Sequence, residues 1–283
     1  MPNTIDADLL IDTLSGEKAI AFLANRLAPL GAFATDFSAD TVPATKSLQI
    51  VKVTAGSTTL KNPTAFNSGD STMSNIAVTV DAYSQQFHIT SKELNQRGRL
   101  ENLAEANLNE LALTISKVWT ALVLVGTFTN PAVTVAQANF AAANAKTLLG
   151  SVMKCAQKSL ILDGVAFAQL APSDKNAFQL GETGAYGFQG IHCQTDWTGA
   201  TANVYGFAAG KQAFAMYAGI PLMDTGVAAK LDGQKIMELP GLGLSVQVNT
   251  WVDVNTRARL ASYDLAFGAA VAEPTALTVV KSQ

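Results

Sequence analysis

The sequence predicts an α+β fold in which strands lead into one long helix and further strands return near the end of the chain. Three observations support this prediction. Between residues 47 and 90, apolar and polar residues alternate at the period of a β-strand. Between Leu94 and Gly126, apolar residues recur every three to five positions, close to the period of an α-helix. Alternation returns from Leu244 onward.

Residues 1–46 are expected to form an N-terminal arm. A helix is predicted over residues 16–30, because apolar residues recur there at helical spacing, and Pro29 and Gly31 are expected to end it. The residues after it show little periodicity. We therefore expect the arm either to be disordered or to lie on a neighbouring molecule.

Residues 47–90 are expected to form an extended β-hairpin. Its two alternating segments flank KNPTAFNSGDST, from Lys61 to Thr72, whose Asn, Gly, Ser and Pro content is typical of a wide loop. An isolated hairpin is only marginally stable in water. A hairpin of this length is therefore expected to lie on another surface.

Residues 91–134 contain the long helix. From Leu100 to Val125 it would be about 40 Å long, at 1.5 Å per residue. Gly126 is expected to cap its C-terminus, and Pro131 prevents its continuation.

Residues 135–225 alternate between strand and helix patterns, which predicts a mixed α/β lobe. We expect a helix at 139–153, a buried strand with a turn and short helix at 159–171, and a strand at 190–197. A strand running into a helix is expected at 203–220. Residues 226–283 are expected to return as strands, with the two lobes interleaved.

The composition indicates a surface that other copies of the chain cover. The chain is 48% apolar and 14% charged, against about 25% charged in an average soluble protein. A net charge of −3 argues against a general nucleic-acid binder, and two cysteines fit a reducing compartment. The apolar run near Trp119 is too short to span a bilayer, and the N-terminus lacks the early basic residues of a secretory signal. We expect synthesis in the cytosol.

No residue pattern predicts catalysis. Cys193 and His192 are neighbours in a predicted strand, so their side chains would point to opposite faces and would not meet. GFAAGKQ, from Gly206 to Gln212, lacks the spacing and the final Ser or Thr of a phosphate loop, and is interpreted as a strand-to-helix turn. We predict no catalytic, metal-binding or cofactor-binding residues, no cofactor, and no enzyme.

The order of arm, long hairpin, long helix, α/β lobe and returning strands resembles the major capsid proteins of tailed bacteriophages, which have the HK97-type fold. The segments that carry the resemblance are SKELNQRGRLENLAEANLNEL before and within the long helix, and SLILDGVAFAQLA, GFQGIHC and NVYGFAAGKQAFAMYAG in the lobe. LSVQVNTWVDVNTRARLASYDLAFGAAV resembles the closing strands of that family. The resemblance covers essentially the whole chain through its architecture, without a strict motif.

The resemblance implies an N-terminal arm (1–46), an extended loop (47–90), a peripheral domain with a spine helix (91–134) and an α/β axial domain (135–225). Residues 226–283 would supply returning strands shared by the peripheral and axial domains. The implied function is self-assembly into hexamers and pentamers of an icosahedral phage head that encloses double-stranded DNA. The protein would be made and assembled in the cytoplasm of a host bacterium and would end in the virion capsid.

The implied partners are other copies of the chain, scaffolding, portal and decoration proteins, and packaged DNA bound without sequence specificity, but no membrane. The candidate residues for contact between subunits are Lys61, Asn62, Phe66, Arg97, Arg99 and Arg257. Some family members join a loop lysine covalently to an asparagine of a neighbour, but Lys61 alone does not predict this bond. The arm is too short for a cleaved scaffolding region.

Two other functions are compatible with the sequence. An encapsulin-type compartment would keep the fold and hold a cargo enzyme in place of DNA. A small-molecule-binding or hydrolytic α/β protein would place its site in the lobe from Ser159 to Ile220, near Asp196, His192 and Lys211.

Overall fold

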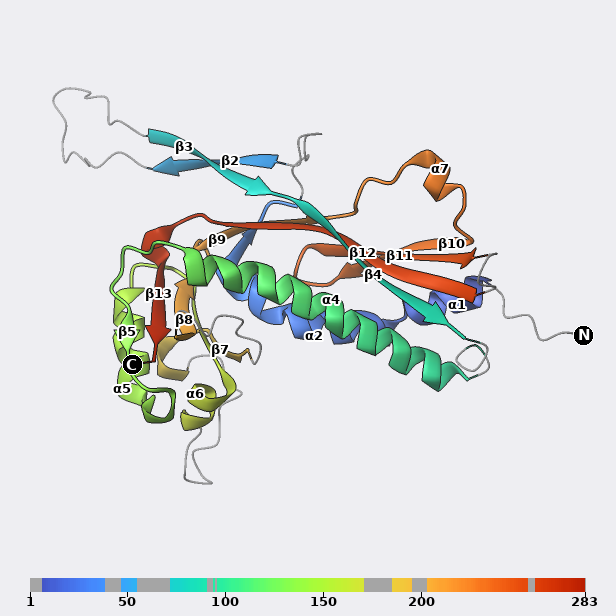
Figure 1. Ribbon diagram of the computed structural model, residues 1–283. Helices are drawn as coiled ribbons and strands as arrows, with labels where there is room; N and C mark the ends of the chain where they lie inside the picture. The colour runs from blue at the N-terminus through green and yellow to red at the C-terminus, as the bar shows by residue number, and fades with distance from the viewer. Residues whose placement is uncertain are drawn as a thin grey trace, which may run out of the picture.

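The computed structural model describes residues 7–38, 47–54, 72–90, 94, 96–170, 185–194, 203–253 and 258–282. Within these ranges the chain forms a large mixed sheet, a smaller mixed sheet, a two-stranded ribbon and one long helix. Figure 1 shows this helix, α4 (Arg97–Val125), running along the large sheet and ending beside the smaller one. The predicted α+β class is confirmed.

The arm contains helices α1 (Ala7–Leu14) and α2 (Glu17–Phe33). The helix predicted at 16–30 is confirmed, but the prediction that Pro29 and Gly31 end it is wrong. Pro29 has no N–H to donate to the helix, yet the helix continues beyond it. Leu27, Leu30 and Phe33 are buried at intervals of three residues, and their packing offsets the missing hydrogen bond.

The predicted hairpin is confirmed as strands β2 (Ser47–Thr54) and β3 (Thr72–Thr79), which pair antiparallel as a separate ribbon. The chain then passes directly into β4 (Asp81–Ile89), which belongs to the large sheet. The predicted loop tip from Lys61 lies outside the described residues, apart from Thr72 at its end. The ribbon is therefore attached to the body through the β3–β4 junction.

The large sheet is organised around β12 (Ala258–Val271). Along one edge β12 pairs antiparallel first with β11 (Leu244–Asp253) and then with β9 (Phe214–Gly219), and along its other edge with β4. Two further strands complete the sheet: β1 (Ala34–Asp36) pairs with β9, and β10 (Gly233–Leu239) pairs with β11. The order of the main path is therefore β1, β9, β12, β11 and β10. Helix α7 (Thr225–Ala228) lies in the connection from β9 to β10. The predicted returning strands are confirmed.

The smaller sheet has the order β5 (Val133–Thr134), β13 (Leu277–Lys281), β8 (Val204–Gly210), β6 (Lys158–Leu162) and β7 (Gly190–Cys193). Helices α5 (Ala142–Ser151) and α6 (Gly164–Gln169) accompany it, with short 3-10 turns at Gln137–Asn139, Ala185–Gly187 and Pro274–Ala276. Asp163 caps α6 by accepting a hydrogen bond from the Ala166 N–H at 2.9 Å. The strand, turn and short helix predicted at 159–171 are confirmed.

The helix predicted in the second half of 203–220 is wrong, because this stretch forms two strands, β8 and β9. Its alanines favour a helix by intrinsic propensity. In the structure β9 pairs with β1 on one edge and β12 on the other, and most of its side chains are buried. Tertiary burial overrides propensity here, and Gly206–Gln212 lead into a strand-to-strand turn rather than a strand-to-helix turn.

The long helix is confirmed: it begins at Arg97, three residues before Leu100, and ends at Val125 as predicted. Gly126 is its C-terminal cap, and its N–H donates to the Leu122 carbonyl at 2.8 Å. Gly126 has a φ of −64°, so a left-handed conformation is not the reason for glycine at this position. By length and composition alone, α4 could cross a membrane. Its buried stripe instead packs against α2, β4 and β12, as expected for a core helix.

Four aromatic side chains join the helices to both sheets. Phe33 of α2 lies with its ring centroid 4.8 Å from that of Trp119 in α4, 5.3 Å from that of Phe207 in β8, and 5.5 Å from that of Phe214 in β9. Trp119 also contacts Phe207 edge to face at 5.8 Å. All four are almost completely buried. The arm helix, the long helix and the two sheets therefore share one core.

A second close contact fixes the base of the ribbon. A Cβ added to Gly268 of β12 would lie 2.3 Å from the carbonyl oxygen of Thr79, at the end of β3. Only glycine lets the two backbones pass at this distance. The direction in which the ribbon leaves the body therefore depends on Gly268.

We predict that Trp119→Ala lowers the free energy of unfolding by about 3–5 kcal/mol, because it removes the largest side chain of the aromatic cluster. Val125→Ala, on the same helix at a residue 84% exposed, should change it by less than about 0.5 kcal/mol. Urea unfolding followed by circular dichroism measures both. Equal effects of the two substitutions would contradict the shared core.

We predict that Gly268→Ala destabilises the subunit by about 1–3 kcal/mol through the clash with Thr79. Gly98→Ala is the matched control, because its added Cβ meets nothing within 4 Å beyond its chain neighbours and the backbone of its own helix, and alanine favours a helix by about 1 kcal/mol. Thermal unfolding of both variants tests this. A Gly268→Ala subunit as stable as the wild type would show that the crossing is loose.

Candidate assembly surfaces

Among the described strands, the β2–β3 ribbon has no partner on either of its edges. The two strands pair with each other over eight residue pairs, from Ser47↔Thr79 to Thr54↔Thr72, and form a sheet of their own among the described residues. Figure 1 shows the ribbon leading away from the large sheet. Free strand edges carry N–H and C=O groups that can pair with another chain.

One face of the ribbon is anchored to the body. Leu48, Ile50 and Val78 are buried in a small apolar cluster that also contains Val80, Ala215 and Ala266. Lys52 forms an ion pair with Glu273, which follows β12. The anchored face explains how a two-stranded ribbon holds its place beside the large sheet.

The other face of the ribbon exposes large apolar side chains. Val51 is 56% exposed and Met73 is 74% exposed. Leu222, between β9 and α7, is 97% exposed, and Val125 lies exposed at the end of α4. These residues were not predicted as contact sites. The VKV run at 51–53 could have indicated the exposed apolar face of the ribbon. In the sequence pattern, Leu48 and Ile50 make one face of this strand apolar, and Val51 and Val53 make the opposite face apolar as well.

The predicted contact residues are only partly placed by the structure. Lys61, Asn62, Phe66 and Arg257 lie outside the described residues. Arg97 and Arg99 lie exposed at the start of α4. Their role in contact between subunits stays a prediction.

The two arginines at the start of α4 differ in their surroundings. Arg97 Nε lies 3.0 Å from Glu101 Oε1 on the next turn, and Lys18 Nζ of α2 lies 2.7 Å from Glu101 Oε2. The hydrogen bond from Lys18 is the largest cause of the lowered pKa of Glu101. The positive charge of Lys18 and the hydrogen bond and charge of Arg97 lower it further. Arg97 is thus engaged with its own chain, which leaves Arg99 as the better candidate for a neighbour.

Cys193 and His192 show no sign of a nucleophile–base pair. They are consecutive residues of β7, so their side chains point to opposite faces. Desolvation raises the pKa of the Cys193 thiol, with a further contribution from the charge of Asp163. Desolvation also lowers the pKa of His192. A thiol with a raised pKa is a poor nucleophile at neutral pH.

The suggested site near Asp196, His192 and Lys211 is not brought together by the described residues. Asp196 lies outside them. His192 is level with Ile161 of β6, which is level with Phe207 of β8. Lys211 lies four residues beyond Phe207, about 13 Å along the strand direction, and β6 separates its strand from β7. Within the described chain, no group of three or more His, Cys, Asp and Glu residues could hold a metal ion.

Comparison with known proteins yields similarity in structure alone. No protein-family model and no curated protein matches the sequence. The chain is similar to the virus-like particle from Pyrococcus furiosus, at 11% identity and a TM-score of 0.56, over 94% of this chain and 98% of that chain. It is also similar to the capsid of Ralstonia phage GP4, at 9% identity and a TM-score of 0.54, over 88% and 87% of the two chains. The capsid of cyanophage P-SCSP1u matches at 13% identity and a TM-score of 0.53, over 88% and 86%.

These structures share their fold with almost the whole of this chain, although hardly any residues are identical. The fold class expected from the order of arm, hairpin, long helix and lobe is therefore confirmed. The chain has the HK97-type capsid fold.

Proposed function

We propose that this protein is the major capsid protein of a tailed bacteriophage, assembling into hexamers and pentamers of an icosahedral head that encloses double-stranded DNA. The observation that carries the proposal is the β2–β3 ribbon of an HK97-type capsid fold. Within the described part of the chain its edges have no strand partner, and one of its faces exposes apolar side chains. The coarser conclusion, a capsid shell protein, is supported by the capsids and virus-like particle that share the fold.

The distribution of exposed apolar residues supports many moderate contacts rather than one large one. They include Leu9 on the arm, Val51 and Met73 on the ribbon, and Leu222 beside α7. Each patch alone is small, while a closed shell buries all of them in every subunit. Affinity then accumulates over several interfaces of moderate area.

The parts of the fold suggest roles in such a shell. We infer that the smaller sheet with α5 and α6 is the axial domain, and that α4 with the large sheet forms the peripheral domain. Arg99 would help set the register between neighbours, because charge complementarity gives specificity and association rate more than affinity. The interior would enclose DNA without reading its sequence, and the net charge of −3 gives the chain no overall attraction for the phosphate backbone.

An encapsulin-type compartment is the second candidate. The fold is shared with a virus-like particle as well as with phage capsids, so it is compatible with either filling. It would use the same ribbon and the same shell, but its particles would hold protein. Nuclease treatment and the absorbance ratio of purified particles distinguish a DNA filling from a protein filling. A role as a small-molecule or hydrolytic protein is not supported by the placement of His192 and Lys211.

We predict that replacing residues 55–71 by Asn-Gly abolishes assembly and leaves the subunit folded. Thr54 and Thr72 are register partners, so a two-residue turn closes the ribbon without shifting its strands. Particle yield, measured by light scattering and size exclusion, should fall at least about tenfold. The thermal midpoint of the subunit is the control, and normal shells from the shortened chain would overturn the role of the loop.

We predict that Arg99→Glu slows assembly by about two- to tenfold and changes its dependence on salt. Lys154→Glu, at an exposed residue after α5, makes the same change of charge and should assemble like the wild type. Stopped-flow light scattering at several salt concentrations compares the two. If both variants assemble equally fast at every salt concentration, Arg99 lies outside the interfaces.

A further inference from the structure

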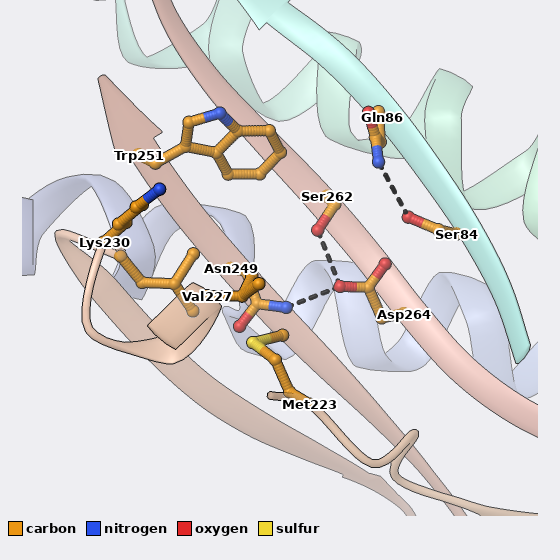
Figure 2. Close-up of a pocket in the computed structure, with 10 residues that line it drawn as sticks. Ser84, Gln86, Met223, Val227, Lys230, Asn249, Trp251, Ser262 and Asp264 are labelled. Carbon is orange, nitrogen blue, oxygen red and sulfur yellow. Dashed lines mark hydrogen bonds between the residues drawn. The ribbon is translucent and has the colours of Figure 1, made fainter. Parts of the chain in front are cut away.

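A pocket of about 260 Å³ lies between the large sheet and the connection that carries α7. Figure 2 shows polar side chains of three adjacent strands on its floor: Ser84 from β4, Asp264 and Ser262 from β12, and Asn249 from β11. Strand register explains why they meet, since Asp264 is level with Ser84, and Ser262 with Asn249. The pocket is thus built from residues far apart in the sequence.

Asp264 is a buried carboxylate that is only half satisfied. Its side chain lies in a residue only 8% exposed, and its Oδ2 accepts hydrogen bonds from Asn249 Nδ2 and from Ser262 Oγ, the latter at 2.7 Å. Its Oδ1 has no hydrogen-bond partner among the described residues. Figure 2 shows this second oxygen on the side of Ser84. The floor therefore holds a buried, negatively charged oxygen that lacks a donor.

Asp264 has no positively charged partner among the described residues. Both of its donors are neutral. A buried carboxylate is costly unless it is paired with a cation. Lys230 lines the same pocket, but Figure 2 shows its amine beside Trp251, away from Asp264. An external cation would complete the site.

The arrangement of acceptors favours an ammonium group over a guanidinium group. A guanidinium binds a carboxylate best through both oxygens, and here Oδ2 already accepts two hydrogen bonds. An ammonium group carries three donors from a single point. Since Oδ1 is buried, a small movement of the Asp264 side chain would let such a group bond both Oδ1 and the hydroxyl of Ser84.

The walls of the pocket are suited to an aliphatic chain. Met223, Val227 and Leu231 come from the α7 connection, and Trp251 comes from β11. Apolar walls of this kind pack along the methylene stem of a lysine or an alkylamine. A water molecule occupies about 30 Å³ of liquid volume. The pocket, at about 260 Å³, can therefore hold an ammonium group together with a short aliphatic chain.

We propose that this pocket binds a primary ammonium group on a short aliphatic chain, with Asp264 as its counter-ion. The group has two possible sources, a lysine side chain of a second copy of this protein or a free alkylamine. Both present the same chemistry to the pocket. Binding by the dispersed subunit does not depend on shell formation, so this proposal and the proposed function can fail separately.

The test is isothermal titration calorimetry of dispersed subunits with n-butylammonium chloride at constant ionic strength. n-Butanol tests whether the apolar walls suffice, and n-propylguanidinium chloride tests the preference for ammonium. We expect saturable binding of n-butylammonium that is at least about tenfold tighter than that of the other two probes. Asp264→Asn should weaken it at least about tenfold, while Asp81→Asn, which removes the same charge from an exposed residue of β4 outside the pocket, should leave it unchanged.

A second variant keeps the test decisive if Asp264→Asn does not fold. Val227 is 52% exposed on the wall of the pocket, so Val227→Trp should fill the space without disturbing the core. It should abolish binding, whereas Lys230→Gln should preserve or strengthen it by removing a competing cation. The proposal is overturned if the wild type gives no saturable heat, if n-butanol binds as tightly as n-butylammonium, or if Val227→Trp binds like the wild type.

Titrating assembled particles distinguishes the two sources. Particles that no longer bind n-butylammonium would show that a lysine of a neighbouring copy occupies the pocket. Particles that bind it as the dispersed subunits do would identify the free amine as the ligand.

Discussion

The contact among Phe33, Trp119, Phe207 and Phe214 is the interaction on which the rest of the structure depends. It brings the arm helix, the long helix and one strand from each sheet into a single core. Edge-to-face aromatic pairs add about 0.5–1.5 kcal/mol each beyond the area that they bury. With these elements held together, the ribbon and the α7 connection can extend from the body without weakening it.

A subunit of this kind separates folding from assembly. The core lies behind α4 and between the sheets. Exposed apolar side chains lie on the arm, the ribbon and the α7 connection, and also at the end of α4, around the smaller sheet and on β10 and β11. The ribbon is oriented at its base by Gly268 against Thr79 and by the ion pair of Lys52 with Glu273. Its free edges then serve contacts with other chains.

The features predicted correctly from the sequence are those with a strong local signal. The period of 3.6 revealed α4, the period of two revealed the ribbon and the returning strands, and an Asp-Gly turn marked the start of α6. Strand β9 was missed because its alanines favour a helix, and only pairing with β1 and β12 makes it a strand. Pro29 was misjudged for a similar reason, since burial of Leu30 and Phe33 continues α2 beyond it.

The candidate surfaces were less predictable than the fold. The ion pair between Arg97 and Glu101 could have been read from their i,i+4 spacing. The partnership of Lys18 with the same carboxylate depends on the packing of α2 against α4, which no local pattern encodes. The pocket around Asp264 could not be predicted from the sequence either. Ser84 and Asn249 lie beside Asp264 only because of the register between their strands and β12, which no local pattern encodes.

Electron microscopy of the negatively stained protein, alone and with the products of neighbouring genes, tests the shell function most directly. The proposal predicts closed shells, rings of five or six subunits, or tubes, because each subunit carries several surfaces that only other copies can cover. A uniform population of monomers or dimers under every condition would contradict it. The low charge of the chain and the projecting ribbon would then need a different explanation.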